Sequence, residues 1–208
     1  MKQEKLLGFY DYTVVLTYAG MLFAFFGIMM SINARFFEAL LCLLGSGVCD
    51  MFDGAVASTK LRTPEEKRFG IQIDSLCDVV CFGAFPMILC YSIGMRGPAG
   101  ISILVFYLIA GVIRLAFFNV MEEKRQEETD EARKYYPGLP ITSIAIILPL
   151  FCTLRPLLGH RFLSELHICI LTVGLLFIIN FPLRKPGWKM LTLLVAIVSC
   201  ALIKIYFF

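Results

Sequence analysis

Long apolar runs fill most of this 208-residue chain and constrain its fold more than any other feature. Each run is close to the roughly 20 residues that an α-helix needs to cross the hydrocarbon core of a bilayer. Because backbone groups in hydrocarbon must satisfy one another's hydrogen bonds, each run is expected to form a helix. The runs cover residues 12–32, 37–57, 70–92, 99–120, 140–157, 163–181 and 188–207. The sequence therefore predicts an all-α fold, a polytopic transmembrane helical bundle with six to seven spans.

The composition excludes other broad classes of protein. Hydrophobic residues make up 59% of the chain and charged residues 17%, whereas soluble domains have roughly 45–50% and about 25%. Intrinsic disorder needs the opposite balance, low hydrophobicity with high net charge. The net charge is +3, and no basic stripe interleaved with aromatic residues indicates a nucleic-acid partner. We expect one integral-membrane domain over residues 1–208, embedded in the lipid bilayer.

The lysines and arginines predict the orientation, because loops rich in these residues stay in the cytoplasm. With the N-terminus inside, thirteen basic residues fall on the inner side and four on the outer side. The inner residues are Lys2, Lys5, Lys60, Arg62, Lys67, Arg68, Lys124, Arg125, Arg133, Lys134, Arg184, Lys185 and Lys189, and the outer ones are Arg35, Arg96, Arg155 and Arg161. This asymmetry predicts a multi-pass protein of the cell (cytoplasmic) membrane. The polar connection 121–139 is expected to form a short inner surface helix ended by Pro137 and Gly138.

Four aspartates lie inside the second and third runs. Asp50 and Asp53 are three residues apart and Asp74 and Asp78 are four apart, so each pair shares one face of a helix. Counted from the ends of the two runs, the carboxylates lie about 6–12 Å beneath the inner surface at 1.5 Å per residue. Two consecutive antiparallel helices are thus expected to bring four carboxylates to one depth, facing the cytoplasm.

Three interpretations of these acids are open, since each mid-membrane aspartate costs about 2.5–3.5 kcal/mol and something must offset it. Ion pairing is the first, with Arg114 in the fourth run or with basic residues of the 58–69 loop, although one guanidinium does not neutralise four carboxylates. A proton or cation pathway is the second, but transporters place such acids near the midplane in two related halves. Divalent metal is the third: two Mg²⁺ or Mn²⁺ ions would balance the charge and clamp a phosphoryl displacement. Charge balance favours the metal.

At these positions the sequence resembles the CDP-alcohol phosphotransferase family. The family signature is D-x-x-D-G-x-x-A-R, a short spacer, and G-x-x-x-D-x-x-x-D, and this chain matches seven of the eight fixed positions. The matching residues are Asp50, Asp53, Gly54, Ala57, Gly70, Asp74 and Asp78. Three stretches, 69–83, 114–119 and 138–140, resemble the membrane-embedded phosphatidylserine synthases within the family. The resemblance covers roughly residues 45–145.

The resemblance implies the family's transmembrane fold, a catalytic core over about residues 37–181 and a possible homodimer. It implies that CDP-diacylglycerol donates a phosphatidyl group to L-serine, releasing CMP. Asp50, Asp53, Asp74 and Asp78 would hold Mg²⁺ or Mn²⁺, and Asp78 would also be the general base on the serine hydroxyl.

The small signature residues Gly54, Ala57 and Gly70 would let the cytidine and phosphates approach. The alternatives left open are another acceptor (glycerol phosphate or inositol phosphate), an ether-lipid donor, an ion-coupled transporter and a catalytically inactive structural homologue.

The sequence departs from the family pattern in two residues and one spacing. Ser58 stands where the signature has arginine, Phe117 replaces a second arginine, and the spacer 59–69 is longer than usual. Other cations are therefore expected to contact the phosphates, and the candidates are Lys60, Arg62 and Arg68. Arg114 is the candidate for an anionic headgroup or the serine carboxylate, and an ion pair with Asp78 or another of the aspartates is the equal alternative.

Overall fold

Helices form nearly all of the computed structural model, which describes residues 8–10, 12–128, 135–184, 192–193 and 195–200. The α-helices are α1 (Val15–Ile32), α2 (Phe36–Ala57), α3 (Pro64–Asp78), α4 (Phe85–Ile93), α5 (Pro98–Glu128), α6 (Ile144–Thr153), α7 (Arg155–Leu158) and α8 (Phe162–Ile178). Short 3₁₀ turns cover Tyr12–Val14, Ile141–Ser143 and Gly159–Arg161, and a π-helical segment covers Val79–Ala84. Two three-residue strands, β1 (Tyr135–Pro137) and β2 (Pro182–Arg184), pair antiparallel.

The prediction of an all-α, multi-pass membrane protein is confirmed. Five helical stretches of the described chain are long and apolar enough to cross a bilayer, and Ile141–Thr153 is a shorter apolar one. The five are Tyr12–Ile32, Phe36–Ala57, Pro64–Ile93, Pro98–Arg125 and Arg155–Ile178. These six stretches overlap the first six predicted runs in the same order. Of the seventh run, 188–207, the described residues are helical and the others lie outside the described part of the chain.

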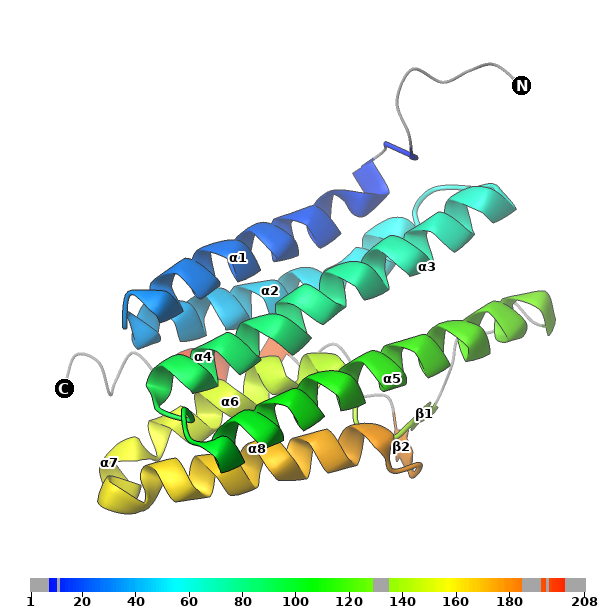
Figure 1. The fold of residues 1–208 in the computed structure, drawn as a ribbon. Coiled ribbons are helices and arrows are strands. Elements are labelled where there is room, and N and C mark those ends of the chain that lie inside the picture. The colour runs from blue at the N-terminus through cyan, green and yellow to red at the C-terminus, as the bar shows by residue number, and fades with distance from the viewer. Residues whose placement is uncertain (1–7, 11, 129–134, 185–191, 194, 201–208) are drawn as a thin grey trace.

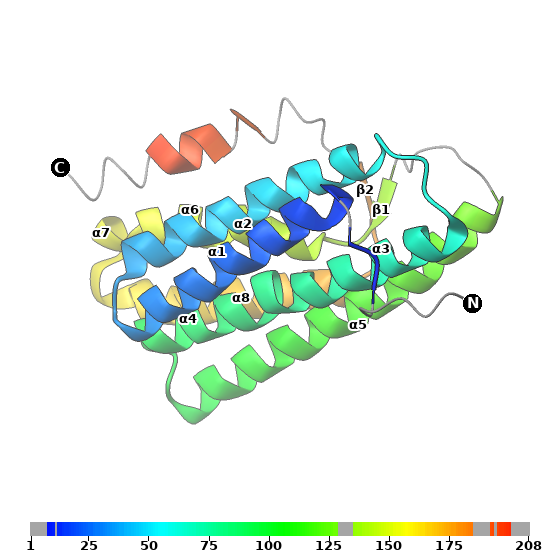
Figure 2. The same ribbon diagram turned by 90° about the horizontal axis from the view of Figure 1, so that it is seen from above.

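The helices form one bundle, and its middle member contains the π-helical segment. Figure 1 shows α3, the π segment and α4 as one continuous rod between α1 and α5, and Figure 2 shows the same order from above. α1 packs most extensively against α2, and α5 against α8. Fully buried apolar residues such as Leu43, Phe85, Leu89, Ile144 and Leu148 form the core. Large apolar side chains also cover the outside, as lipid contact requires.

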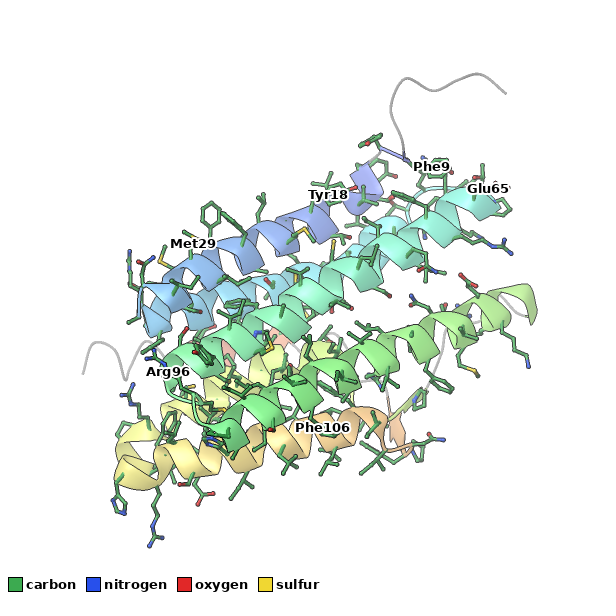
Figure 3. All side chains as sticks on the ribbon, viewed as in Figure 1. Phe9, Tyr18, Met29, Glu65, Arg96 and Phe106 are labelled. Atoms are coloured by element: carbon green, nitrogen blue, oxygen red, sulfur yellow. The ribbon has the colours of Figure 1, made fainter. Side chains whose placement is uncertain are left out.

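The two ends of the bundle differ in what they carry. In Figure 3, Phe9 and Glu65 lie at one end and Met29 and Arg96 at the other. α2 finishes and α3 begins at the first of these, which we call the α2–α3 end. The strand pair lies at the same end and joins the segment after α5 to the segment after α8. Which end faces the cytoplasm stays a prediction from the charge distribution.

α3 begins six residues before the predicted apolar run because its first turn carries a strong helix-start signal. Thr63 Oγ1 accepts a hydrogen bond from the Glu66 backbone N–H (3.2 Å), and the Glu66 carboxylate accepts one from the Thr63 N–H (2.8 Å). Pro64 occupies the first helical position, where its fixed φ suits a helix. These capping residues, rather than the first residue of the apolar run, therefore set the start of α3.

The prediction of a separate surface helix after residue 120 is wrong for the described residues. α5 continues without a break to Glu128, well past the apolar run. Arg125 and Glu122 form an ion pair with a 2.6 Å contact on this extension, the i, i+3 arrangement that supports an exposed helix. The first residues of the polar connection, up to Glu128, thus belong to the same helix as the transmembrane stretch.

Close packing between α1 and α4 depends on Gly27. A methyl group there would overlap the ring of Phe85 and lie 2.9 Å from the Cys42 Cβ. We expect Gly27→Ala to lower the thermal midpoint of the detergent-purified protein, by an overpacking penalty of about 1–3 kcal/mol. Gly97→Ala is the matched control, because a Cβ at Gly97 would meet nothing within 4 Å. Equal midpoints for the two variants would contradict this account of the α1–α4 contact.

Candidate metal centre

Three carboxylates converge between α2 and α3. One oxygen each from Asp50, Asp74 and Asp78 lies within 4.8 Å of the others. Asp78 is the most enclosed, with a relative exposure of 9%. The helical spacing explains the convergence: Asp74 and Asp78 are one turn apart on α3, so both face the strip of α2 that carries Asp50.

The fourth aspartate, Asp53, lies beside the other three. Asp53 lines the same small pocket as Asp50, Asp74 and Asp78. Asp53 also accepts a long hydrogen bond of 3.5 Å from Thr17 Oγ1 on α1. Like-charged groups this close require protons or cations to offset their repulsion. The four predicted aspartates therefore form one continuous cluster.

A small pocket opens onto the cluster, and α1 forms one of its walls. Leu16, Thr17 and Gly20 line this wall, opposite the aspartates of α2 and α3. From the sequence, only the second, third and fourth runs and the 58–69 loop were predicted to contribute to the site, so the contribution of α1 is an addition. The sequence did contain a signal for this contribution: Thr13 and Thr17 are hydroxyl residues four positions apart in an apolar run, so they lie on one face of a helix. In the structure both are buried.

The donor set fits a hard divalent cation. Mg²⁺ binds oxygen ligands at about 2.0–2.1 Å and commonly keeps positions for water and substrate phosphate. Two ligand oxygens on such an ion are therefore about 3–4 Å apart, so three oxygens within 4.8 Å need little movement to share one. Carboxylate oxygens also suit Mn²⁺. The arrangement matches the charge-balance argument made from the sequence.

Ion pairing does not account for the cluster. Among the residues that the structure describes, the ion pairs involve Glu38, Glu66 and Glu122, and none of the four aspartates is in one. Lys60, a candidate to fold back, contacts Glu66 at 3.1 Å. The predicted alternative, an ion pair between Arg114 and one of these four aspartates, is therefore not found in the described part of the chain.

Arg114 lies at the level of Asp78 but is engaged elsewhere. Hydrogen bonds between Ser75 and Asn119 and between Tyr107 and Phe82 show that α5 runs antiparallel to the α3 rod, which sets this register. The buried Arg114 guanidinium donates to the Pro137 carbonyl oxygen at 2.7 Å. It thus ties the strand pair to α5, a role that the sequence analysis missed.

The candidate phosphate-binding residues surround the α2–α3 end. Gly54 is exposed, and a Cβ there would meet nothing within 4 Å, so the chain leaves open space at this signature position. Arg62 lies across Gly70, where a Cβ would come 2.9 Å from its Nη1. Ala57 is the last residue of α2, and Ser58 caps that helix by donating to the Ala55 carbonyl at 2.7 Å. Arg68 is exposed on the first turns of α3.

A sequence comparison now decides the family. The family described as CDP-alcohol phosphatidyltransferase matches residues 13–180, which includes α1 and all four aspartates. The chain belongs to this family. The match extends beyond the stretch of about 45–145 on which the resemblance was first based.

Several relatives carry the name CDP-diacylglycerol–serine O-phosphatidyltransferase. The protein of Helicobacter pylori is 30% identical over 191 residues, covering 84% of this chain and 75% of the relative. That of Methanocaldococcus jannaschii is 32% identical over 153 residues, covering 74% and 67%. That of Saccharomyces cerevisiae is 34% identical over 116 residues, covering 54% and 41%, so the match spans less than half of the yeast protein.

The later stretches of the family resemblance also meet α3. Ser75, between the two aspartates of α3, donates to Asn119 Oδ1 at 2.7 Å. Gly138 adopts a φ of +71°, and a Cβ there would lie 2.7 Å from the Ile179 carbonyl oxygen. Only glycine fits this left-handed position against the end of α8. The 114–119 and 138–140 stretches thus hold α3, α5 and α8 together beside the aspartates.

Proposed function

We propose that this member of the CDP-alcohol phosphatidyltransferase family transfers a phosphatidyl group from CDP-diacylglycerol to L-serine and releases CMP. The observation that carries the proposal is the convergence of Asp50, Asp74 and Asp78 oxygens within 4.8 Å at signature positions. The names of the relatives support serine as the acceptor. In this proposal the site faces the cytoplasm, in line with the positive charge on that side.

The four aspartates have two roles in this proposal: they hold the cation and they accept a proton. Asp50, Asp53 and Asp74 hold Mg²⁺ or Mn²⁺, with Asp78 contributing to the same cluster. When bound, the cation polarises the phosphoryl group next to the diacylglycerol and stabilises the CMP that leaves. The rigid helices α2 and α3 fix these carboxylates relative to one another, which supplies the positioning that phosphoryl transfer requires.

Asp78 acts as the general base in the proposed reaction. The serine hydroxyl oxygen forms a bond to the phosphorus that carries the diacylglycerol, and the bond from that phosphorus to the CMP oxygen breaks. The hydroxyl proton passes to the Asp78 carboxylate. Asp78 suits this role because it is the most enclosed of the four, so bulk water does not compete for the proton.

The donor fits the location of the site. Its acyl chains require the bilayer, and its pyrophosphate lies at the headgroup level, near the α2–α3 end. The open space at Gly54 admits the nucleotide, and Arg62 beside Gly70 is the cation best placed for the phosphates. Arg114 stays the candidate for the serine carboxylate or a headgroup. A guanidinium has five N–H donors, so its bond to Pro137 is compatible with that role.

One assay tests the proposed function. Purified protein in detergent is given CDP-diacylglycerol, Mg²⁺ or Mn²⁺, and in turn L-serine, glycerol phosphate or inositol phosphate, and CMP release is measured. We expect CMP only with serine. CMP with another alcohol would reassign the acceptor, and no CMP with any alcohol would refute the transferase proposal. Uptake driven by an ion gradient in proteoliposomes, without CMP, would indicate a transporter.

Donor binding should depend more on Arg62 than on Lys60. We expect Arg62→Ala to raise the KM for CDP-diacylglycerol at least about tenfold, because it loses one charge-assisted contact of about 1.5–3 kcal/mol. Lys60→Ala is the comparison, because the Lys60 ammonium group lies against Glu66. Its KM is expected to change less than threefold, below about 0.7 kcal/mol. An unchanged KM for Arg62→Ala would show that another residue contacts the phosphates.

A further inference from the structure

The helix directly after Asp78 departs from α-helical geometry. Residues Val79–Ala84 form a π-helical segment, in which the Phe85 backbone N–H bonds to the Val80 carbonyl, five residues back. A π segment contains one residue more per turn than an α-helix, and such segments are rare. Its first residue follows Asp78, so any change in the segment acts on the end of α3.

Pro86 explains why the widened turn forms here. A proline lacks the backbone N–H, and its ring clashes with the carbonyl four residues earlier. For Pro86 that carbonyl belongs to Phe82, inside the π segment. The Phe82 carbonyl must therefore tilt away from the helix axis and needs a donor from outside its own helix.

Tyr107 on α5 provides that donor. Its hydroxyl donates to the Phe82 carbonyl oxygen at 2.5 Å, and both residues are almost completely buried. Gly83 allows α5 to come this close, because a Cβ there would lie 2.9 Å from the Leu108 Cδ1 on α5. On the other side of α5, a Cβ at Gly174 of α8 would lie 3.3 Å from the Tyr107 Cα, so α8 packs closely against α5 at this residue.

We propose that Tyr107 is a positioning residue that keeps the π segment in place and thereby sets the direction of Asp78. Removing the extra residue of a π turn rotates one flanking helix against the other by about 100°. α4 is fixed by its packing, with Phe85 completely buried against α1, so α3 is the part that would turn. The chemical role of Asp78 rests on the proposed function, whereas its place in the carboxylate cluster does not.

Tyr107→Phe removes one hydroxyl and keeps the ring. A turn of α3 would displace Asp74 as well as Asp78, since both lie on this helix. We therefore expect Mn²⁺ to bind about tenfold more weakly, measured by electron paramagnetic resonance of the free ion, as for other residues that orient metal ligands. The kcat for CMP release should fall about tenfold, with the KM for serine within twofold. Tyr91→Phe on α4 is the matched control, because Tyr91 is 45% exposed. Unchanged Mn²⁺ affinity in Tyr107→Phe would overturn the proposal, even if the wild type released no CMP.

A double variant separates positioning from simple stabilisation. Pro86→Ala restores an N–H that can reach the Phe82 carbonyl in an α-helical turn. In the Tyr107→Phe background it should therefore recover the thermal midpoint while Mn²⁺ affinity and kcat stay low, because the widened turn is lost. Recovery of all three together would show that Tyr107 only satisfies a buried carbonyl and would refute its positioning role.

Discussion

Asp78→Asn should reduce CMP release by about a thousandfold, within the 10²–10⁴ range for loss of a general base. The amide has nearly the same shape as the carboxyl group, so the packing around this buried position should persist. It does not accept the serine proton, however, and this loss acts on kcat. We expect the binding of Mn²⁺ and of CDP-diacylglycerol to be largely kept, because Asp50, Asp53 and Asp74, which hold the cation in the proposed function, are unchanged in this variant.

The control for this variant is Glu38→Gln, which removes a carboxylate from α2 outside the cluster. Glu38 pairs with Arg35 at 2.7 Å near the start of α2, and an exposed pair of this kind contributes little. CMP release should therefore stay close to that of the wild type. Near-normal transfer by Asp78→Asn itself would disprove the assignment of the base. A loss of Mn²⁺ binding as large as the loss of turnover would make Asp78 chiefly a metal ligand.

The sequence predicted the transmembrane helices well because hydrocarbon permits few solutions. The run 12–32 and the described stretch Tyr12–Ile32 agree at both ends, since no helix-capping signal outside the apolar run shifts either end. α3 was less well predicted: hydropathy placed its start at Gly70, whereas the capping box at Thr63 sets it earlier. The clustering of the aspartates could be predicted from spacing alone, because helical periodicity and the hairpin leave them only one relative placement.

The remaining parts of the site depend on contacts between distant helices, and no local pattern reveals these. Thr13 and Thr17 are hydroxyl residues in an otherwise apolar run, but nothing in their spacing indicates that Thr17 contacts Asp53. Arg114 was expected near anions, yet it lies beside the strand pair and donates a hydrogen bond to the Pro137 carbonyl oxygen. Pro86 was visible within a run, but its consequence for Phe82 appears only once Tyr107 is placed against it.

Removing divalent cations should abolish turnover. After treatment with EDTA we expect CMP release to fall at least a hundredfold, and Mg²⁺ or Mn²⁺ to restore it, because the charge that develops on the leaving phosphate then has no partner. Asp50→Asn should resemble EDTA-treated wild type and should not recover at ordinary Mn²⁺ concentrations. Full activity in EDTA would contradict a metal-dependent reaction.

The order of thermal stability of the same two proteins should depend on the cation, which tests the metal centre without any substrate. Without cations, the wild-type carboxyl groups repel one another unless they take up protons, so Asp50→Asn should raise the midpoint in EDTA by removing one negative charge. With Mn²⁺ at about a hundred times its Kd, the wild type should gain about 2.7 kcal/mol. The variant lacks Asp50, one of the three carboxylates proposed to hold the cation, and should gain far less. The order of the two midpoints should therefore reverse on adding Mn²⁺. If Asp50→Asn were the less stable protein in EDTA as well, the four aspartates would be held together by contacts other than a cation, and the metal would have to lie elsewhere.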